Sequence, residues 1–333
     1  MRTRIWTIFI AFVLLSSFAP AQEKSKSCDR ACLEKYVDRY MDAMLENSPS
    51  LELFSRDCRL TENGVRLPLG NDGLWLNMSG KGNYKFYIPD VETQQVAFFG
   101  TAREGAANKQ GEAPLVAVAI RLKIVNSLIT EAEQLVLRSD SDTMGMTGKL
   151  SVGASVEKME KPHAIYRETI PEAEQSSREE LIKVANYYFS GMQKNDGKGY
   201  YPFTDDCHRI ENGMPATNDP VPEGQKRPDP KTATMYSSAW GCKEQFESGL
   251  IGFVTRIRDR RFVAVDRERG IVFSFGFFDH DKLNWTWQIA ELFKIEKGKM
   301  RRIEALFHRC PYGMNSGWST YEQGMSDQIQ SIR

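Results

Sequence analysis

The sequence has no excess of charge of either sign, because 44 Lys and Arg residues are balanced by 44 Asp and Glu residues in 333. A balanced chain has no basic field for nucleic acid or anionic lipid, so we expect neither as a partner. The glycine-rich phosphate loops of nucleotide-binding proteins and the short motifs of serine hydrolases and zinc proteases are also missing. With only four histidines, all far apart, and no Cys-x-x-Cys pair, the sequence predicts no metal site and no organic cofactor.

Only one apolar run is long, and it lies at the N-terminus. Arg2 and Arg4 precede the apolar run 5–18, and Ala19-Pro20-Ala21 follows it. The run is shorter than the roughly 20 residues that span a bilayer, so 1–21 is predicted to be a cleaved signal peptide rather than a membrane anchor. The mature chain is then expected to be secreted or periplasmic, without membrane attachment after cleavage.

A repeat divides the remaining chain into two copies. The pattern Cys-x-x-x-Glu-Asn-Gly occurs at 58–64 and again at 207–213, and 119–138 aligns without a gap with 290–309. The offset is therefore 149 residues at the first landmark (58 to 207) and 171 at the second (119 to 290), so the second copy has 22 extra residues between them. Five prolines lie within 215–230, which predicts an ordered loop or lid in that insertion.

Each copy begins with apolar residues at helical spacing, over 29–46 and 178–192. Long strands are predicted after them, at 93–103, 114–125 and 128–138 in the first copy and at 252–258, 261–267, 271–278, 285–295 and 299–308 in the second. A helix followed by a meander of long curved strands predicts an α+β fold of two cones, each with a pocket at its open end. The segment 139–176 lacks periodicity and is interpreted as a linker, although 162–166 has residues that can pack on a neighbour.

This order of elements resembles the NTF2-like superfamily, and within it the SnoaL-like and ketosteroid-isomerase-like enzymes. The resemblance covers 28–138 and 177–318, which are the two predicted domains. The paired motifs, the endings 130–133 and 302–305 and the closing segment 311–318 are similar to a functionally uncharacterised family of exported two-domain proteins. The resemblance implies two tandem NTF2-like cones but no particular reaction, because this fold is shared by isomerases, dehydratases, cyclases, lyases and binding proteins.

The six cysteines of an exported chain are expected to form disulfides. Cys207 lies on the strand of the second Cys-x-x-x-Glu-Asn-Gly motif and Cys242 on the short helix after it, which predicts a bridge between them. The other four pair in one of three ways; they are Cys28, Cys32, Cys58 and Cys310.

The second Cys-x-x-x-Glu-Asn-Gly strand is the first candidate for a functional site. Alternation places Cys207, Arg209 and Glu211 on one face and His208, Ile210 and Asn212 on the other. Glu211, like Glu62 in the first copy, is either a pocket carboxylate that acts as a general base or a structural group that bonds backbone at the turn. We favour the structural role, because both copies keep the Glu and the Asn.

The histidines distinguish the copies, since His208 and His308 have no histidine counterpart in the first copy. Either imidazole is a candidate catalytic base, oriented by Asp206, Glu211 or Glu304. The alternative is that both are partly exposed histidines without partners.

Other motifs have a simpler interpretation. Trp285, Trp287, Ile289, Glu291 and Phe293 share one strand face and either line a pocket for a flat aromatic or sugar-like ligand or belong to the core, which we favour. The basic run 256–261 is interpreted as a solvated hairpin cap, because an aspartate interrupts it. Asn77 and Asn284 begin glycosylation sequons, whose use depends on the source of the protein.

Two functions remain open. The chain is either a cofactor-free acid–base lyase, dehydratase or isomerase for a small organic molecule, with the second copy as the active cone, or a non-catalytic small-ligand-binding or scaffolding protein. Geometry distinguishes them: the enzyme needs an imidazole within about 3.2 Å of a carboxylate at a cavity. Histidines that point into separate regions favour binding. The oligomeric state is not predicted.

Overall fold

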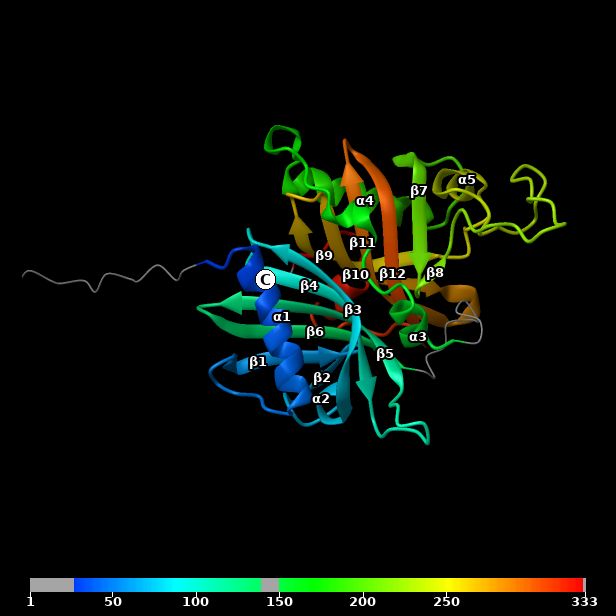
Figure 1. Ribbon diagram of the computed structural model, residues 1–333. Coiled ribbons are helices and arrows are strands. Elements are labelled where there is room, and N and C mark those ends of the chain that lie inside the picture. Colours follow the sequence, from blue (N-terminus) through cyan, green and yellow to red (C-terminus); the bar gives the residue numbers. More distant parts are fainter. Residues whose placement is uncertain (1–26, 139–149, 332–333) are drawn as a thin grey trace, which may run out of the picture.

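The computed structural model describes residues 27–138 and 150–331, and the predicted signal peptide lies outside them. The described chain forms two six-stranded curved sheets, each with a helix against one face (Figure 1). No helix in these two ranges is long and apolar enough to cross a membrane.

The first cone begins with a helix and ends with its longest strands paired as a meander. Its elements are α1 (Arg30–Leu45), β1 (Phe54–Glu62), β2 (Val65–Leu67), α2 (Leu74–Asn77), β3 (Met78–Asp90), β4 (Gln95–Glu104), β5 (Leu115–Val125) and β6 (Leu128–Leu137). The strand order is β2-β1-β6-β5-β4-β3. β1 pairs with β6 in parallel, and the other neighbours are antiparallel.

The second cone repeats this topology. Its elements are α4 (Arg178–Met192), β7 (Phe203–Glu211), β8 (Met214–Pro215), α5 (Cys242–Glu247), β9 (Arg256–Asp266), β10 (Ile271–His280), the short 3-10 helix η3 (Asp281–Leu283), β11 (Trp285–Glu296) and β12 (Lys299–Pro311). The strand order β8-β7-β12-β11-β10-β9 matches the first sheet position by position. The predicted α+β fold class with two cones is therefore confirmed. Two details differ: β3 was not predicted, and 252–267 holds the single strand β9 rather than two strands.

The Asn-Gly turn after β1 and β7 explains why both copies keep the asparagine. Asn63 and Asn212 have φ of 48° and 51°, and the following glycines have φ of 78°, as a tight hairpin turn requires. The Asn212 amide donates to the Phe307 carbonyl and accepts from the Phe307 N–H, and Asn63 makes the same two bonds with Val136. The asparagines thus continue the parallel pairing with side-chain bonds.

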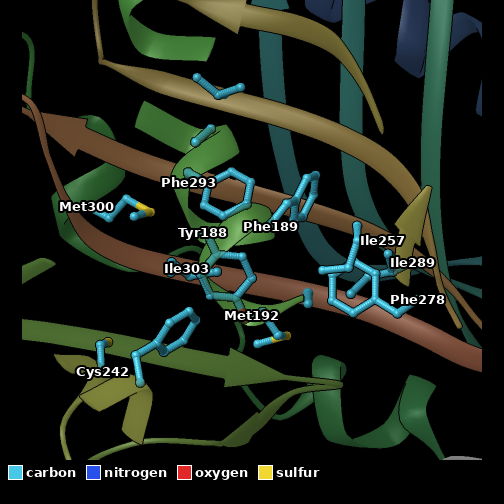
Figure 2. Close-up of a cluster of buried hydrophobic side chains, with 14 of the residues drawn as sticks. Tyr188, Phe189, Met192, Cys242, Ile257, Phe278, Ile289, Phe293, Met300 and Ile303 are labelled. Atoms are coloured by element: carbon cyan, nitrogen blue, oxygen red, sulfur yellow. The ribbon is translucent and has the colours of Figure 1, made fainter. Parts of the chain in front are cut away.

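The helix of each cone fills the concave face of its sheet. α4 starts at a capping box in which Ser177 and Glu180 bond each other's backbone N–H groups, and it buries the side of the helix that carries Tyr188 and Phe189. Figure 2 shows these two side chains and Met192 pointing into the same cluster as Phe293 of β11. The aromatic faces and edges pack closely, with ring centroids of Tyr188 and Phe293 5.4 Å apart.

The opposite faces of the two sheets pack against each other and form a third core. Phe99 of β4 meets Phe273 of β10 with ring centroids 5.2 Å apart. The segment between the cones contributes to this core through α3 (Val152–Glu157) and the 3-10 helix η1 (Ala164–Arg167), and it continues through η2 (Glu172–Glu174) (Figure 1). Val156 and Tyr166 are buried there, so α3 and η1 of the predicted linker pack on this core, whereas 168–176 is exposed or half-buried.

The interpretation of the basic run 256–261 as a solvated hairpin cap is wrong. The run lies within β9. Arg258 and Arg261 are at most 1% exposed. Arg258 pairs with Asp279 at 2.9 Å, and Arg261 makes two hydrogen bonds of 2.7 and 2.8 Å with Glu133 of the first cone. Packing of one sheet on the other buries this strand on both faces, which the charge pattern alone does not reveal.

Two disulfides lie among the described residues, Cys207–Cys242 and Cys28–Cys32. The first confirms the predicted bridge between β7 and α5. The second agrees with half of one open pairing, but its other half, Cys58–Cys310, is not formed, so the expectation that all six cysteines form disulfides is wrong. Cys58 and Cys310 are free thiols, and burial raises the pKa of each to about 12.

After β12 the chain returns to the first cone. Trp318 lies between the guanidinium groups of Arg59 and Arg121, 4.3 and 4.5 Å from its ring, and donates its indole N–H to Thr61 at 2.8 Å. The short helix α6 (Tyr321–Gly324) follows. This segment therefore ties the two sheets together outside their shared core.

Candidate functional site in the second cone

Two glutamates lie in one row across the sheet of the second cone. Glu211 of β7 is the register partner of Ala305 of β12, and Ala305 is the partner of Glu291 of β11. Paired residues on neighbouring strands point to the same face. Because the residue between them is an alanine, nothing larger than a methyl group separates the two carboxyl groups on the concave face.

Arg209 holds Glu211 in place. Its Nη2 lies 2.5 Å from Glu211 Oε1, and its Nη1 donates to Gln245 Oε1 of α5 at 2.9 Å. Alternation along β7 places both residues on the concave face together with Cys207, whose disulfide fixes α5 against the strand. The ion pair is nearly enclosed, since the two side chains are 5% and 14% exposed.

Glu291 is a carboxyl group that is buried inside the cone, with 1% of the residue exposed. Burial raises its pKa to about 8, with the nearby Glu211 carboxylate as the second cause, while Arg209 and Tyr188 oppose the shift. At neutral pH the group is therefore mostly a neutral acid that can donate a proton. Its Oε2 is buried and has no hydrogen-bond partner among the residues that the structure describes, and the same holds for Nε1 of the neighbouring Trp287.

These groups line a small enclosed cavity between α4 and the sheet. The walls above Glu211 and Glu291 are aromatic and aliphatic side chains, among them Tyr188, Trp287 and Phe307. The free volume is about 30 Å³, which has room for little more than a water molecule. The cavity thus has unsatisfied polar atoms but is closed in this structure.

A larger groove reaches the same carboxylate from outside. It has a volume of about 240 Å³, lies along β8 and the insertion that follows, and shares Glu211 and Tyr236 with the cavity. Tyr236 packs on Phe253 with ring centroids 5.8 Å apart, and both are exposed by more than a third, at 38% and 40%. We call these two residues the aromatic gate, because they cover the cavity from the side of the groove.

The first cone has a different set of side chains at the three positions that match Glu211, Ala305 and Glu291. The matching positions are Glu62, Gln134 and Ile120, and they carry no second carboxyl group. Glu62 accepts hydrogen bonds from Gln134 at 2.7 Å, from the Leu74 N–H at 2.8 Å and from Arg138 at 2.6 Å. Trp75 is buried and donates to the Tyr40 hydroxyl, which in turn donates to Gln134. Glu62 therefore has the structural role that the sequence analysis favoured, whereas Glu211 faces a cavity.

The structure places the two predicted histidines away from this cavity. Phe307 and Arg209 point into the cone, so their neighbours His308 and His208 point to the other face of the sheet. His308 bonds Gln288 at 3.2 Å, and burial with the nearby Arg138 lowers its pKa to about 4. His208 is exposed, and burial of part of the ring, followed by Arg302, lowers its pKa.

The predicted orienting residues are also separated. Asp206 is exposed and lies 3.3 Å from Arg301. Glu304 bonds Arg302 at 2.9 Å and faces Tyr84 between the sheets. Of the four predicted site residues, His208, His308, Asp206 and Glu211, only Glu211 lines the cavity. The structure brings no imidazole of the described residues within hydrogen-bonding distance of a carboxylate in this cone.

A further histidine lies beside the aromatic gate. His280 is 1% exposed and stacks on Trp285 with ring centroids 3.9 Å apart. Burial lowers its pKa to about 4, so it is neutral at physiological pH. The sequence analysis did not select His280, because nothing in its spacing sets it apart.

Comparisons with known proteins add a family match and two structural likenesses. A family model described as a domain of unknown function (DUF8021) matches residues 174–307. No match to a curated protein was found. A de novo designed protein with a curved β-sheet is 19% identical, with a TM-score of 0.25 and an alignment that covers 39% of this chain and 87% of that one. An NTF2-like protein of unknown function from Cytophaga hutchinsonii is 11% identical, with a TM-score of 0.24 and coverage of 32% and 99%.

Proposed function

We propose that the second cone binds a small organic molecule that accepts a hydrogen bond from the protonated Glu291 carboxyl group. One observation carries this proposal: a buried carboxyl group with a pKa of about 8 keeps an oxygen without a partner in a cavity beside a second carboxylate. A buried polar atom without a partner costs roughly 1–3 kcal/mol, which a ligand that bonds it recovers. The first cone, in which Ile120 replaces Glu291, has no such vacancy in its row.

The walls define the chemistry of the ligand. Trp287, Phe307 and Tyr188 offer flat apolar surfaces, while Glu291 and the Trp287 indole N–H offer two donors. A ring that carries a carbonyl, ether or hydroxyl oxygen satisfies both requirements. An anion is disfavoured, because the Glu211 carboxylate lines both the cavity and the groove that leads to it.

Binding requires the aromatic gate to open. The closed cavity is smaller than any organic ligand, whereas the outer groove of about 240 Å³ is of suitable size. Movement of Tyr236 joins the two spaces, since this residue lines both. The insertion that carries it is anchored by Trp240, which is buried and donates to the Pro228 carbonyl at 2.8 Å. Because Trp240 holds the insertion in place, we expect the side chains of the aromatic gate to be the part that moves.

Acid–base catalysis is the second candidate function. A neutral Glu291 and a Glu211 paired with Arg209 form a proton donor and a proton acceptor in one cavity. Such a pair is suited to moving a proton on a carbonyl compound without a cofactor. It replaces the histidine-based mechanism, which we no longer propose.

Ligand-observed NMR with a set of small cyclic carbonyl compounds and sugars tests the binding proposal. We expect compounds that bind the native protein to bind at least tenfold more weakly to Glu291→Ile, which copies the first cone. Glu62→Gln, which removes a buried carboxylate from the first cone, is expected to leave binding unchanged. Binding should also weaken as the pH rises through about 8, because Glu291 then loses its proton. Equal binding by the native protein and Glu291→Ile contradicts the proposal.

Deuterium incorporation distinguishes an enzyme from a binding protein. Carbonyl compounds that bind are incubated with the protein in D₂O and analysed by mass spectrometry. An enzyme accelerates exchange at the carbon next to the carbonyl, and Glu211→Gln abolishes the acceleration while binding persists. Binding without exchange supports the non-catalytic function.

We further propose that the chain is exported and that the two domains extend over 28–138 and 177–318. The two disulfides support an oxidising compartment.

A further inference from the structure

One buried arginine of the second cone lacks the partner that the others have. Arg121, Arg209, Arg258 and Arg261 are buried and each lies within 4.0 Å of a carboxylate oxygen. Arg260, on β9, is only 4% exposed, yet no carboxylate among residues 27–138 and 150–331 lies within that distance. A buried charge without a counter-charge is unfavourable, so this position calls for an explanation.

The partners of Arg260 are all neutral. Its Nε donates to the Ile257 carbonyl at 2.8 Å, its Nη1 to Asn186 at 3.2 Å and Ser190 at 3.1 Å, and its Nη2 to Gln193 at 2.9 Å. A guanidinium has five N–H groups, so one remains. Burial lowers the pKa of Arg260 to about 10, and the nearby Asp327 carboxylate opposes this shift only in part.

The remaining donor faces a polar groove between α4 and the C-terminal segment. The groove has a volume of about 390 Å³, and Asn186, Ser190 and Gln193 form one wall at helical spacing. Asp327 stands on the far side, where it accepts a hydrogen bond from the Gln193 amide at 3.2 Å. The Gln193 side chain therefore separates Arg260 from Asp327, the one carboxylate that lines the groove among residues 27–138 and 150–331.

We propose that this groove is a binding site for a small oxyanion, a carboxylate or a phosphate, with Arg260 as its counter-charge. The free N–H of Arg260 and the Ser190 hydroxyl supply donors to the oxyanion, and the Asn186 amide can turn to supply a third. The ligand carries a single anionic group at the Arg260 end, because Asp327 repels a second one. This site is separate from the cavity of Glu291 and does not depend on the function proposed for it.

Thermal unfolding with added anions tests the proposal. Sodium phosphate and sodium acetate are titrated against the native protein, with sodium chloride at matched ionic strength as the reference. Ligands that bind only the folded state raise the Tm with concentration. We expect phosphate or acetate to raise the Tm beyond chloride, and the one that acts identifies which oxyanion the groove prefers.

Two variants assign the effect to Arg260. Arg260→Gln removes the charge and should lose the anion-dependent rise, whereas Arg256→Gln, on the same strand but paired with Asp279, should retain it. Asn186→Asp places a carboxylate within reach of Arg260 Nη1 and should raise the Tm without anion and abolish the anion response. Asn186→Asp decides the question if Arg260→Gln does not fold.

Either of two outcomes overturns the proposal. One is a native protein whose Tm responds to phosphate and acetate only as it does to chloride. The other is an anion response that persists undiminished in both Arg260→Gln and Asn186→Asp, because the anion then binds elsewhere.

Discussion

Replacement of Glu291 by glutamine should stabilise the protein, and the gain should grow with pH. The pKa of Glu291 is raised from 4.5 to about 8, so the folded state prefers the protonated carboxyl. Its contribution to stability is therefore fully present below pH 4.5 and is lost as the pH rises through 8. At 1.36 kcal/mol for each pKa unit, the loss reaches about 3 kcal/mol at pH 7 and about 5 kcal/mol above pH 9.

Glutamine has nearly the same shape and stays neutral, so Glu291→Gln escapes this loss. We expect its free energy of unfolding to equal that of the native protein near pH 4.5 and to exceed it by about 3 kcal/mol at pH 7. Urea unfolding followed by tryptophan fluorescence at pH 5, 7 and 9 measures the difference. The control is Glu62→Gln, which weakens the bonds to Arg138, Gln134 and the Leu74 N–H and should cost about 2 kcal/mol. A Glu291→Gln variant that is no more stable than the native protein at pH 9 refutes the reasoning.

Three other predictions concern the framework. Cys207→Ser with Cys242→Ser should lower the free energy of unfolding by roughly 3–4 kcal/mol in urea, because a bridge across 35 residues is lost; an unchanged urea midpoint argues against the bridge. Glu133→Gln should cost about 3–5 kcal/mol, since it removes a buried carboxylate that pairs with Arg261 and Arg121 and leaves Arg261 with Asp259 alone, and differential scanning calorimetry would detect the lower Tm. Cys58 and Cys310 should resist iodoacetamide at pH 8 in the folded protein, because burial raises both pKa values to about 12; mass spectrometry before and after unfolding counts the labelled thiols.

The fold could be predicted from the sequence because the repeat supplies the same pattern twice. The Cys-x-x-x-Glu-Asn-Gly motifs mark β1 and β7, and the ungapped match from 119–138 to 290–309 fixes β5 with β6 and β11 with β12. Packing between the sheets could not be predicted in the same way. Arg258 and Arg261 look solvated in sequence, because their partners, Asp279 and Glu133, are distant along the chain.

Part of the candidate site could have been predicted from the sequence, although the sequence analysis did not select it. Alternation already places His208 on the opposite face from Glu211, so this pair could not share a cavity. The repeat also aligns Glu291 with Ile120 and Ala305 with Gln134, which marks a carboxyl group gained and a bulky side chain lost at adjacent positions. What the sequence could not show is that Trp75 of α2 is buried next to Tyr40 in the first cone while the second keeps a cavity, because that depends on how distant segments pack on each sheet.

The back-to-back packing of two cones in one polypeptide removes a constraint that symmetry imposes on oligomers. In a homodimer of identical subunits, every substitution appears at both symmetry-related positions, so a destabilising carboxyl group and its void would occur twice. Here Glu291 occurs in one half, and the other half keeps a saturated hydrogen-bond network around Glu62. Because the halves share the core around Phe99 and Phe273, the well-packed half supports the one that carries the unfavourable group. Substitutions that empty the second cone further should therefore be tolerated better in this chain than in an isolated second cone.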